Sequence, residues 1–475
     1  MKNNYKLKII CLLCVLTAAF SSCKKNELAE EKTLTNRHNM QASAGDGVWD
    51  LLGYGYDVTG EYANSSASKF SVIDVVKLKA DYFDRVEKDE ASRKYGEVIG
   101  GENAASYLSN LTDKLGASAS VPQGDIPKTT PADGKNLPIP LFKLSVTSSF
   151  DNTNAWSSKY VYSSYSLKIQ QKRVKINAEA ELLRQYLQPA FISDVQNSSP
   201  QQIVAKFGTH VLKDIILGAK LSVHYRAETN TTDRKEASTS GIDVNVLGIF
   251  GINTSQTSST QQTTNNTNWK LVYETIGGEP SASLSGSATA GSAPSVSTTA
   301  WENSSSLNNA ELIDFTKDGL IPIWDLIADP VKSAAVKAYV IQYLIDGQAK
   351  LNIEVASLYR YYNGTDHYYT TTSGNYPSYH LEGTEGYLYK YQETGTVPLY
   401  QYYNGTDHYY TTTNGSYSGY QFQGIVGYIY INQFPGTVPL YRYYNNTDHY
   451  YATASGNYPG YHYEGIAGYL YKTKP

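Results

Sequence analysis

The hydrophobic and polar positions of this chain change period along its length. Residues 141–176 hold two runs in which apolar and polar residues alternate, and this pattern predicts β-strands. The apolar members are Phe142, Leu144 and Val146 in the first run and Tyr165, Leu167 and Ile169 in the second. From 177 to 206 apolar residues recur at spacings of three and four, which predicts helices interrupted at Pro189 and Pro200. The chain is therefore predicted to mix helices and strands.

A different pattern occupies residues 228–268, where Thr, Ser, Asn and Gln dominate. Five apolar residues inside it share one parity: Ile242, Val244, Val246, Phe250 and Ile252. Asp243, Asn245 and Asn253 fall on the other parity. A strand that is apolar on one side and polar on the other is typical of a membrane β-barrel. Two alternatives stay open, namely short helices packed on a sheet and a low-complexity loop.

The last part of the chain, from Leu358 onward, repeats three times with a period of 41 residues. Asn-x-Thr-Asp-His-Tyr-Tyr occurs with its aspartate at positions 366, 407 and 448, and residues 359–471 hold 29 of the 44 tyrosines. Short alternating runs separated by turn residues predict an all-β domain over 358–475. We expect a β-trefoil, because a three-bladed propeller would be unusually small and a solenoid would need capping repeats.

Polar and aromatic residues of the repeats are candidates for binding glycans, because aromatic faces stack on sugars and carboxylates bind hydroxyls. The six candidates are Asp366, His367, Asp407, His408, Asp448 and His449. The same aspartates are equally suited to capping turns, and half or more of the tyrosines are expected in the core. No metal site is predicted, since an adjacent Asp-His pair offers at most two ligands per copy.

The N-terminus has the composition of an export signal. Lysines at 2, 6 and 8 precede an apolar run over 9–20 that is too short to span a membrane. Ser21-Ser22-Cys23 resembles the end of a bacterial lipoprotein signal, so residues 1–23 are predicted to form a lipoprotein-type signal peptide. Cys23 would be lipidated and would become the first residue of the mature chain. An ordinary signal peptide cut nearby is the alternative.

The residues after Cys23 are polar and acidic, and 24–45 is predicted to be a flexible tether or to include a surface-export tag. All three cysteines (Cys11, Cys14 and Cys23) lie in the leader. A bacterial outer-membrane lipoprotein, surface-exposed or released, is the expected location. The formal net charge of −4 gives no electrostatic reason to expect nucleic acid as a partner.

Several glycine-containing motifs follow one another in a recognisable order. Phe207-Gly208-Thr209-His210 precedes an apolar run that reaches Gly218, and Gly277-Gly278 follows the polar segment. Together with a glycine- and aromatic-rich stretch at 46–57, these motifs resemble the membrane attack complex/perforin family, and in particular its bacterial, Bacteroides-type members. The resemblance covers 46–350 and implies an α+β domain with a bent, twisted antiparallel sheet flanked by helical clusters. Residues 301–350 would form its closing helical segment.

The resemblance also implies a function. A family member of this kind would bind a target cell surface, oligomerise into a ring and insert β-hairpins into the membrane, and it would need no cofactor and no catalytic residue. The second inserted segment is placed at 228–268 and the first within 80–165, with its helical part over 77–115. Thr209 and His210 would be structural, and Gly277 and Gly278 would form a hinge, although a bulge or a chain turn ahead of Pro280 fits the same glycines.

The implied partners are membrane lipids, a cell-surface glycan or lipopolysaccharide, and other copies of the chain. The main alternative is a non-lytic adhesin or glycan-binding lipoprotein that keeps the same scaffold. A glycan-processing enzyme is disfavoured, because 46–350 shows no paired carboxylates or nucleophile constellation with suitable spacing.

Overall fold

The computed structural model describes residues 47–116, 141–150, 157–229, 231, 233–254, 266–347, 354–393 and 395–475. The predicted signal peptide with Cys23 (1–23) and the predicted tether (24–45) lie outside the described residues. Within these described ranges, no helix has both the length and the apolar character needed to cross a bilayer. The predicted domain limits stay predictions.

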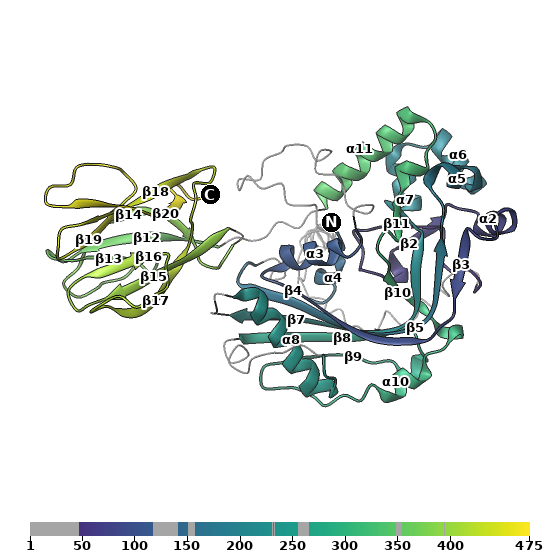
Figure 1. Cartoon of the computed structure of the whole chain (residues 1–475), viewed down its shortest axis with the longest axis horizontal. Helices are drawn as coiled ribbons and strands as arrows, with labels where there is room; N and C mark the ends of the chain where they lie inside the picture. Colours follow the sequence, from purple (N-terminus) through teal and green to yellow (C-terminus); the bar gives the residue numbers. More distant parts are fainter. Residues whose placement is uncertain are drawn as a thin grey trace, which may run out of the picture. The chain divides into compact units, whose positions relative to one another are not determined.

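Two long antiparallel strands, β5 (Tyr160–Ile176) and β7 (Asp214–Thr229), form the centre of a seven-stranded sheet. Figure 1 shows them curving together along their length. The other strands of this sheet are β3 (Val86–Asp89), β4 (Arg93–Gly101), β8 (Asn266–Ile276), β9 (Ser285–Thr289) and β10 (Glu311–Phe315). The expected bent antiparallel sheet of the perforin-like fold is therefore confirmed.

The alternation of β5 agrees with the prediction for Tyr165, Leu167 and Ile169, all of which are buried on the sheet. The run from Phe142 to Val146 was predicted to be a strand, and this prediction is wrong. It forms the short helix α4 (Leu144–Thr147), in which Val146 is buried and Leu144 is half exposed. A five-residue run is too short for its period to separate strand from helix.

The predicted helical region is confirmed as α5 (Ala180–Leu183), α6 (Pro189–Asn197) and α7 (Pro200–Phe207). Ser199 and Gln202 form a capping box at the start of α7, and Pro200 occupies its first turn. The helix ends at Gly208, whose φ of +78° favours glycine. Local sequence signals therefore set both ends of α7.

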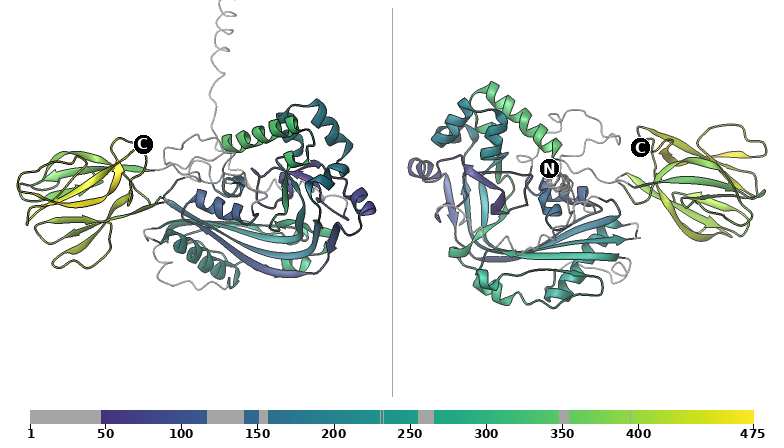
Figure 2. Two further views of the ribbon diagram at one scale, coloured as in Figure 1. Left: turned by 45° about the horizontal axis from the view of Figure 1, so that its top comes forward. Right: turned by 180° about the vertical axis from the view of Figure 1, so that it is seen from behind.

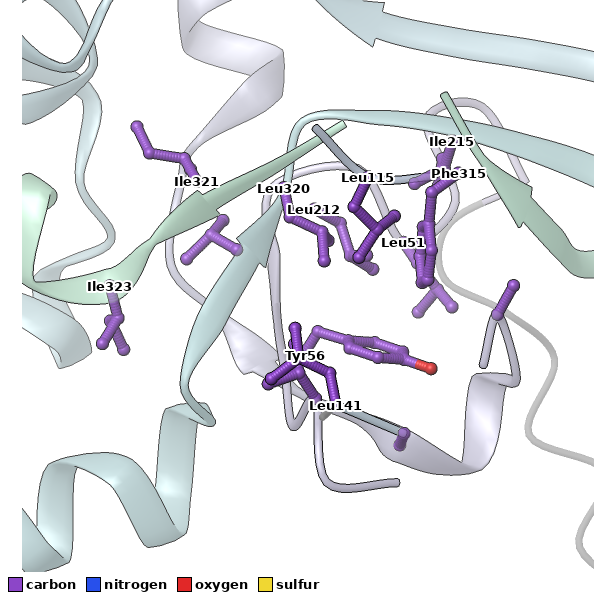
Figure 3. Packing of buried hydrophobic residues seen from close by; sticks show 14 of the residues in the cluster. Leu51, Tyr56, Leu115, Leu141, Leu212, Ile215, Phe315, Leu320, Ile321 and Ile323 are labelled. Atoms are coloured by element: carbon purple, nitrogen blue, oxygen red, sulfur yellow. The ribbon is translucent and has the colours of Figure 1, made fainter. Parts of the chain in front are cut away.

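A smaller four-stranded sheet lies beside these helices in the order β11-β6-β1-β2. Its strands are β1 (Tyr54–Tyr56), β2 (Ser68–Ser71), β6 (His210–Leu212) and β11 (Leu320–Pro322). Figure 3 shows Tyr56, Leu212 and Leu320 of this sheet packed in one core with Phe315 of β10 and Ile215 of β7 from the large sheet.

The predicted closing helical segment is only partly helical. It holds β10 and β11 together with α10 (Thr299–Ser304), the 3-10 turn η7 (Ile323–Leu326) and α11 (Pro330–Asp346). The predicted helical part of the first segment is also mixed, with α2 (Val75–Asp81) and α3 (Ala104–Asp113) on either side of β3 and β4. The remaining elements are α8 (Arg234–Phe250) and the 3-10 turns η2 (Ser65–Ala67), η4 (Arg184–Tyr186), η5 (Pro280–Ala282) and η6 (Leu307–Asn309).

The C-terminal repeats form an all-β region of nine strands. In each copy a first strand pairs antiparallel with both a short second strand and a long third strand. The copies comprise β12 (Val355–Tyr362), β13 (His367–Thr370) and β14 (His380–Tyr389); β15 (Thr396–Tyr403), β16 (His408–Thr411) and β17 (Gln421–Tyr430); and β18 (Thr437–Tyr444), β19 (His449–Ala452) and β20 (His462–Tyr471). The third strands β14, β17 and β20 each pair with the other two, and these pairings join the three copies into one sheet.

An all-β region is confirmed, whereas the β-trefoil is not: each repeat supplies three strands to one nine-stranded sheet. Of the 29 tyrosines in this region, 11 are buried, which is fewer than the expected half. Three of them, Tyr369, Tyr410 and Tyr451, exchange hydrogen bonds in a cycle around the pseudo-threefold axis. The core of this region therefore uses one tyrosine from each copy at the same position.

Candidate functional site

The large sheet bends where its two central strands change partners. Residues 215–218 of β7 pair with β10, whereas β7 pairs with β8 from Lys220 onward. On β5 the register with β7 shifts between Gln170 and Lys172, so that Gln171 is bulged out of the ladder. A bulge bends its strand and increases its twist. The bend is therefore built from a bulge on one strand and a change of partner on the other.

Glycines allow the strands to approach closely at this bend. A Cβ on Gly218 would lie 1.9 Å from the backbone oxygen of Ile169, and a Cβ on Gly277 would lie 2.2 Å from the backbone oxygen of Gly218. Gly277 and Gly278 also have φ angles of +67° and +78°, which other residues rarely adopt. Trp301 donates its indole N–H to the oxygen of Gly277 at 3.0 Å. The structure brings these glycines to the bend, and their action as a hinge stays a prediction.

The motif that precedes β7 ties the small sheet together. The backbone N–H of Thr209 donates to the oxygen of Tyr56 at 2.9 Å, and a Cβ on Gly208 would lie 2.6 Å from the same oxygen. The Thr209 hydroxyl accepts from the backbone N–H of Val58 at 3.1 Å and donates to the backbone oxygen of Tyr56 at 3.2 Å. His210 is fully buried, with Nδ1 3.0 Å from that hydroxyl and its ring against Trp324. These contacts are structural and offer no access to a substrate.

Replacing Thr209 with valine should lower the free energy of unfolding by about 1–3 kcal/mol, because the buried N–H of Val58 loses its acceptor. Thr209→Ser is the matched control, since it keeps the hydroxyl, and it should lose less. Urea unfolding followed by tryptophan fluorescence measures both variants. Equal midpoints for the valine and serine variants would contradict the role given to the hydroxyl.

A buried network of charges holds α3 against one face of the sheet. The Lys168 ammonium on β5 lies 2.6 Å from Asp314 on β10 and 2.8 Å from Glu97 on β4. Lys114, at the C-terminal end of α3, pairs with the same two carboxylates. Burial alone would raise the pKa of Asp314, but the two lysines hold it below its usual value. The network therefore ties the end of α3 to three strands.

The space around this network is polar although α3 covers it. A cavity there is lined by several charged and hydroxyl-bearing side chains: Glu61, Glu97, Lys114, Lys168, Lys220 and Glu274, with Ser164, Ser166 and Ser222. Burial lowers the pKa of Lys220 to about 8 and that of His224 to about 4. This cluster is not apparent from the sequence, because its members come from distant segments of the chain. The one local signal is Lys168, a charge between the apolar Leu167 and Ile169.

The helix α8 packs on the opposite face of the sheet. Figure 1 and the left view of Figure 2 show α3 on one side of the sheet and α8 on the other. Four buried apolar residues of α8 belong to one cluster with Val161, Tyr165, Leu221 and Val223 of the central strands, namely Ile242, Val246, Ile249 and Phe250. The α3 residues Tyr107, Leu108 and Leu111 belong to another cluster.

The segment predicted to insert as a strand is thus helical here, which is the first of the two alternatives left open. Ile242 and Val246 are fully buried and Phe250 nearly so, whereas Val244 is 41% exposed. This distribution follows a helical face and not the parity of a strand. Ile252, just beyond α8, packs partly buried against the same cluster. Insertion of these five residues as a strand stays a prediction.

The six candidate glycan-binding residues lie inside the C-terminal region. All six are buried, each aspartate being at most 1% exposed. Each aspartate accepts two hydrogen bonds from the histidine of another repeat: Asp366 from His408, Asp407 from His449 and Asp448 from His367. A tyrosine hydroxyl from its own repeat donates a third bond to each aspartate.

The three carboxylates approach one another within 4.8 Å, but histidine and tyrosine donors already bind their oxygens. The Asp-His pair is therefore the same in all three copies because it forms the contacts between neighbouring repeats. Glycan binding by these residues stays a prediction, and their burial does not favour it.

Comparison with models of protein families gives two matches. The model of the MAC/Perforin domain matches residues 41–350, and a model described as a domain of unknown function, DUF5648, matches residues 336–418 and 357–471. A comparison with curated proteins gives no match.

Solved structures with a similar arrangement include a proposed cell invasion protein with a MAC/Perforin domain from Bacteroides thetaiotaomicron, with 17% identity, a TM-score of 0.47 and coverage of 72% of this chain and 69% of that one. GNIP1Aa from Chromobacterium piscinae has 14% identity and a TM-score of 0.49, over 88% of this chain and 82% of that one. A non-hemolytic pneumolysin from Streptococcus pneumoniae has 13% identity and a TM-score of 0.25, over 50% and 42%.

The family follows from the family model, because its match spans well over half of the chain. The chain belongs to the MAC/perforin family. This perforin-like fold is that of a pore-forming family, and it points to a non-enzymatic protein.

Proposed function

We propose that this chain is a pore-forming protein that oligomerises on a target membrane and inserts two β-hairpins per copy. One observation carries the proposal: the connections 102–159 and 230–265 join neighbouring long strands, and the helices described within them pack on opposite faces of the sheet. The first connection joins β4 to β5 and the second joins β7 to β8. Each connection therefore sits where it can lengthen an existing antiparallel pair.

The lengths of the connections suit this role. A membrane-spanning β-strand needs about 9–11 residues, so that a hairpin needs roughly 20 and a turn. The second connection has 36 residues and the first has 58. Spanning strands must close into a barrel, because open sheet edges cannot be solvated in lipid. A ring of copies that each donate two hairpins would close such a barrel. The partners of the chain would therefore be other copies of itself and membrane lipids.

We further propose that the C-terminal repeat region directs the protein to a cell-surface glycan or lipopolysaccharide. The region has three equivalent units, and binding by all three would raise avidity. Lipidation at Cys23 would place the protein on the outer membrane of its bacterium before release. An antibacterial toxin fits this combination of parts.

A disulfide that tethers α8 to the sheet tests the proposal. A Cβ on Gly100 of β4 would lie 2.6 Å from the Ser238 side-chain oxygen, so Gly100→Cys with Ser238→Cys places the two thiols side by side. Because the same Cβ would lie 2.6 Å from Thr239 Cγ2, the Gly100→Cys single variant measures the effect of the added Cβ alone. We expect the oxidised double variant to release no dye from liposomes of a susceptible bacterium's lipids. Addition of a reductant should restore release to the level of the two single-cysteine variants, which serve as controls.

Full dye release by the oxidised variant would refute insertion of the second segment. The alternative function, a non-lytic adhesin, predicts another result: the unmodified protein would release no dye from any lipid extract but would still bind glycans in an array.

A further inference from the structure

Arg234, the first residue of α8, lies in the second connection but binds both ends of the first. Its Nε donates to the backbone oxygen of Glu102 at 3.1 Å, and its Nη2 donates to the backbone oxygen of Ser158 at 2.7 Å. Glu102 directly follows β4, and Ser158 lies two residues before β5 begins. The side chain is 2% exposed, so water does not compete for these two bonds.

The two carbonyls occupy special positions in the ladder between β4 and β5. Gly101 of β4 pairs with Tyr162 of β5, and Gly100 pairs with Ser163. Continued in the same register, the ladder would next place Glu102 opposite Val161 and would reach Ser158 three steps later. Lengthening of the β4–β5 pair requires the backbone at both positions to become extended and to join this ladder. In the described structure Arg234 holds both of these carbonyls instead.

Further contacts keep the beginning of α8 at the same place. The Ser163 hydroxyl on β5 donates to the oxygen of Ser238 at 2.8 Å, and the Asn266 amide on β8 donates to the oxygen of Ala237 at 2.8 Å. Gly100 lets β4 approach Ser238 and Thr239 of α8. The first turns of α8 are thereby fixed to β4, β5 and β8, and Arg234 extends from this fixed point to the first connection.

We propose that Arg234 is a positioning residue that couples the two connections, so that neither is released from the sheet while the other stays docked. Departure of α8 removes the guanidinium from both carbonyls and with it this restraint on lengthening of the β4–β5 ladder. Departure of the first connection leaves a buried guanidinium without these acceptors, which is costly and favours the release of α8. The inference deepens the proposed function and rests on it for its biological role.

Hydrogen exchange of the full chain in solution, followed by mass spectrometry, tests the coupling without any membrane. We expect Arg234→Met, which keeps much of the side-chain length but no donor, to speed amide exchange at least tenfold in both α8 and α3. Arg184→Met is the control for loss of an arginine–carbonyl bond outside both connections, because the exposed Arg184 donates its Nε–H to the backbone oxygen of Asp325 at 2.9 Å. This control should leave exchange in α3 and α8 unchanged.

Exchange in β5 and β7, measured in the same experiment, shows whether the sheet is intact. If Arg234→Met does not fold, Arg234→Lys decides: it keeps the charge but cannot reproduce the two-carbonyl fork, and it should speed exchange in α3 at least threefold. Exchange in α3 at the wild-type rate in the folded variants would overturn the coupling, even if α8 itself exchanges faster.

Dye release from liposomes then separates this inference from the proposed function. Faster release by a folded Arg234 variant than by the wild type is expected if both hold. A wild-type protein that releases no dye would count against pore formation, whereas the exchange result would still decide whether Arg234 couples the connections.

Discussion

Gly218→Ala is expected to lower the free energy of unfolding by about 3 kcal/mol or more, the upper end of the range for overpacked sites. The added Cβ would lie 1.9 Å from the oxygen and 2.9 Å from the carbon of the Ile169 peptide group. Both are backbone atoms of the neighbouring strand, so no side-chain rotation relieves the clash and β5 must move away from β7. Because this contact lies at the bend, the change should also reduce membrane insertion.

Gly248→Ala provides the matched control. Gly248 lies within α8, and a Cβ there would meet no atom within 4 Å. Alanine in a helix is more favourable than glycine, so this variant should gain about 0.5–1 kcal/mol. Urea denaturation followed by circular dichroism measures both changes. If the two variants unfold at the same urea concentration, the close approach assigned to Gly218 is wrong.

Asp407→Asn is the second large effect, with an expected loss of about 3–5 kcal/mol, typical of removing one partner of a buried pair. The carboxylate accepts from the backbone N–H of His449 at 2.8 Å, from its Nδ1 at 2.6 Å and from the Tyr420 hydroxyl. Asparagine has a similar shape but only one acceptor oxygen, so its NH₂ group would face a donor. Differential scanning calorimetry on the full chain should show a lower transition temperature for the repeat region.

Glu464→Gln is the comparison in the same region, because Glu464 forms a partly exposed pair with Arg442 at 2.9 Å and lies at a longer distance, 3.6 Å, from Nε2 of His449. Exposed pairs contribute about 1 kcal/mol or less. A loss for Asp407→Asn no larger than that for Glu464→Gln would show that the buried ring does not stabilise the repeats.

The stability of the repeat region should also depend on pH through Asp407. Burial alone would raise the pKa of this carboxyl, but the hydrogen bonds from His449 and Tyr420 hold it below its usual value of about 3.9. A carboxyl with a lowered pKa in the folded state contributes stability that is fully present above its unfolded pKa and is lost as the pH falls through its folded pKa. The repeat transition should therefore move to lower temperature below about pH 4, and this shift should be smaller in Asp407→Asn.

Much of the fold was predictable because its signals are local or periodic. The helices over 177–206 follow from spacings of three and four, and the start of α7 follows from Ser199, Pro200 and Gln202. The repeat period of 41 predicted three equivalent all-β units. The order of those strands was not predictable, because pairing of β14, β17 and β20 depends on contacts between copies that no single copy encodes.

The second connection shows why a pattern can fit two structures. Ile242, Val246 and Phe250 are spaced by four, which keeps residues on one side of a strand and also brings them close together on a helix. Val244 and Ile249 distinguish the two. Val244 shares the parity of the buried residues but is 41% exposed, whereas Ile249 has the other parity and is 1% exposed, and both values favour the helix in this state. Whether this segment forms a helix or a strand depends on the apolar face of β5 and β7, which the helix covers. That face exists only once the sheet has assembled.

The sequence by itself determined the family, the glycine motifs and the repeat, since these depend on residue identity at fixed spacing along the chain. Tertiary structure alone decided the bend at Gly218 and Gly277, the buried charges around Lys168 and the bridge made by Arg234. Lys168 and Asp314 are separated by 146 residues, and Arg234 and Glu102 by 132. Such pairs form only when the sheet has placed their strands side by side, because folding and not sequence proximity brings their atoms within hydrogen-bonding distance.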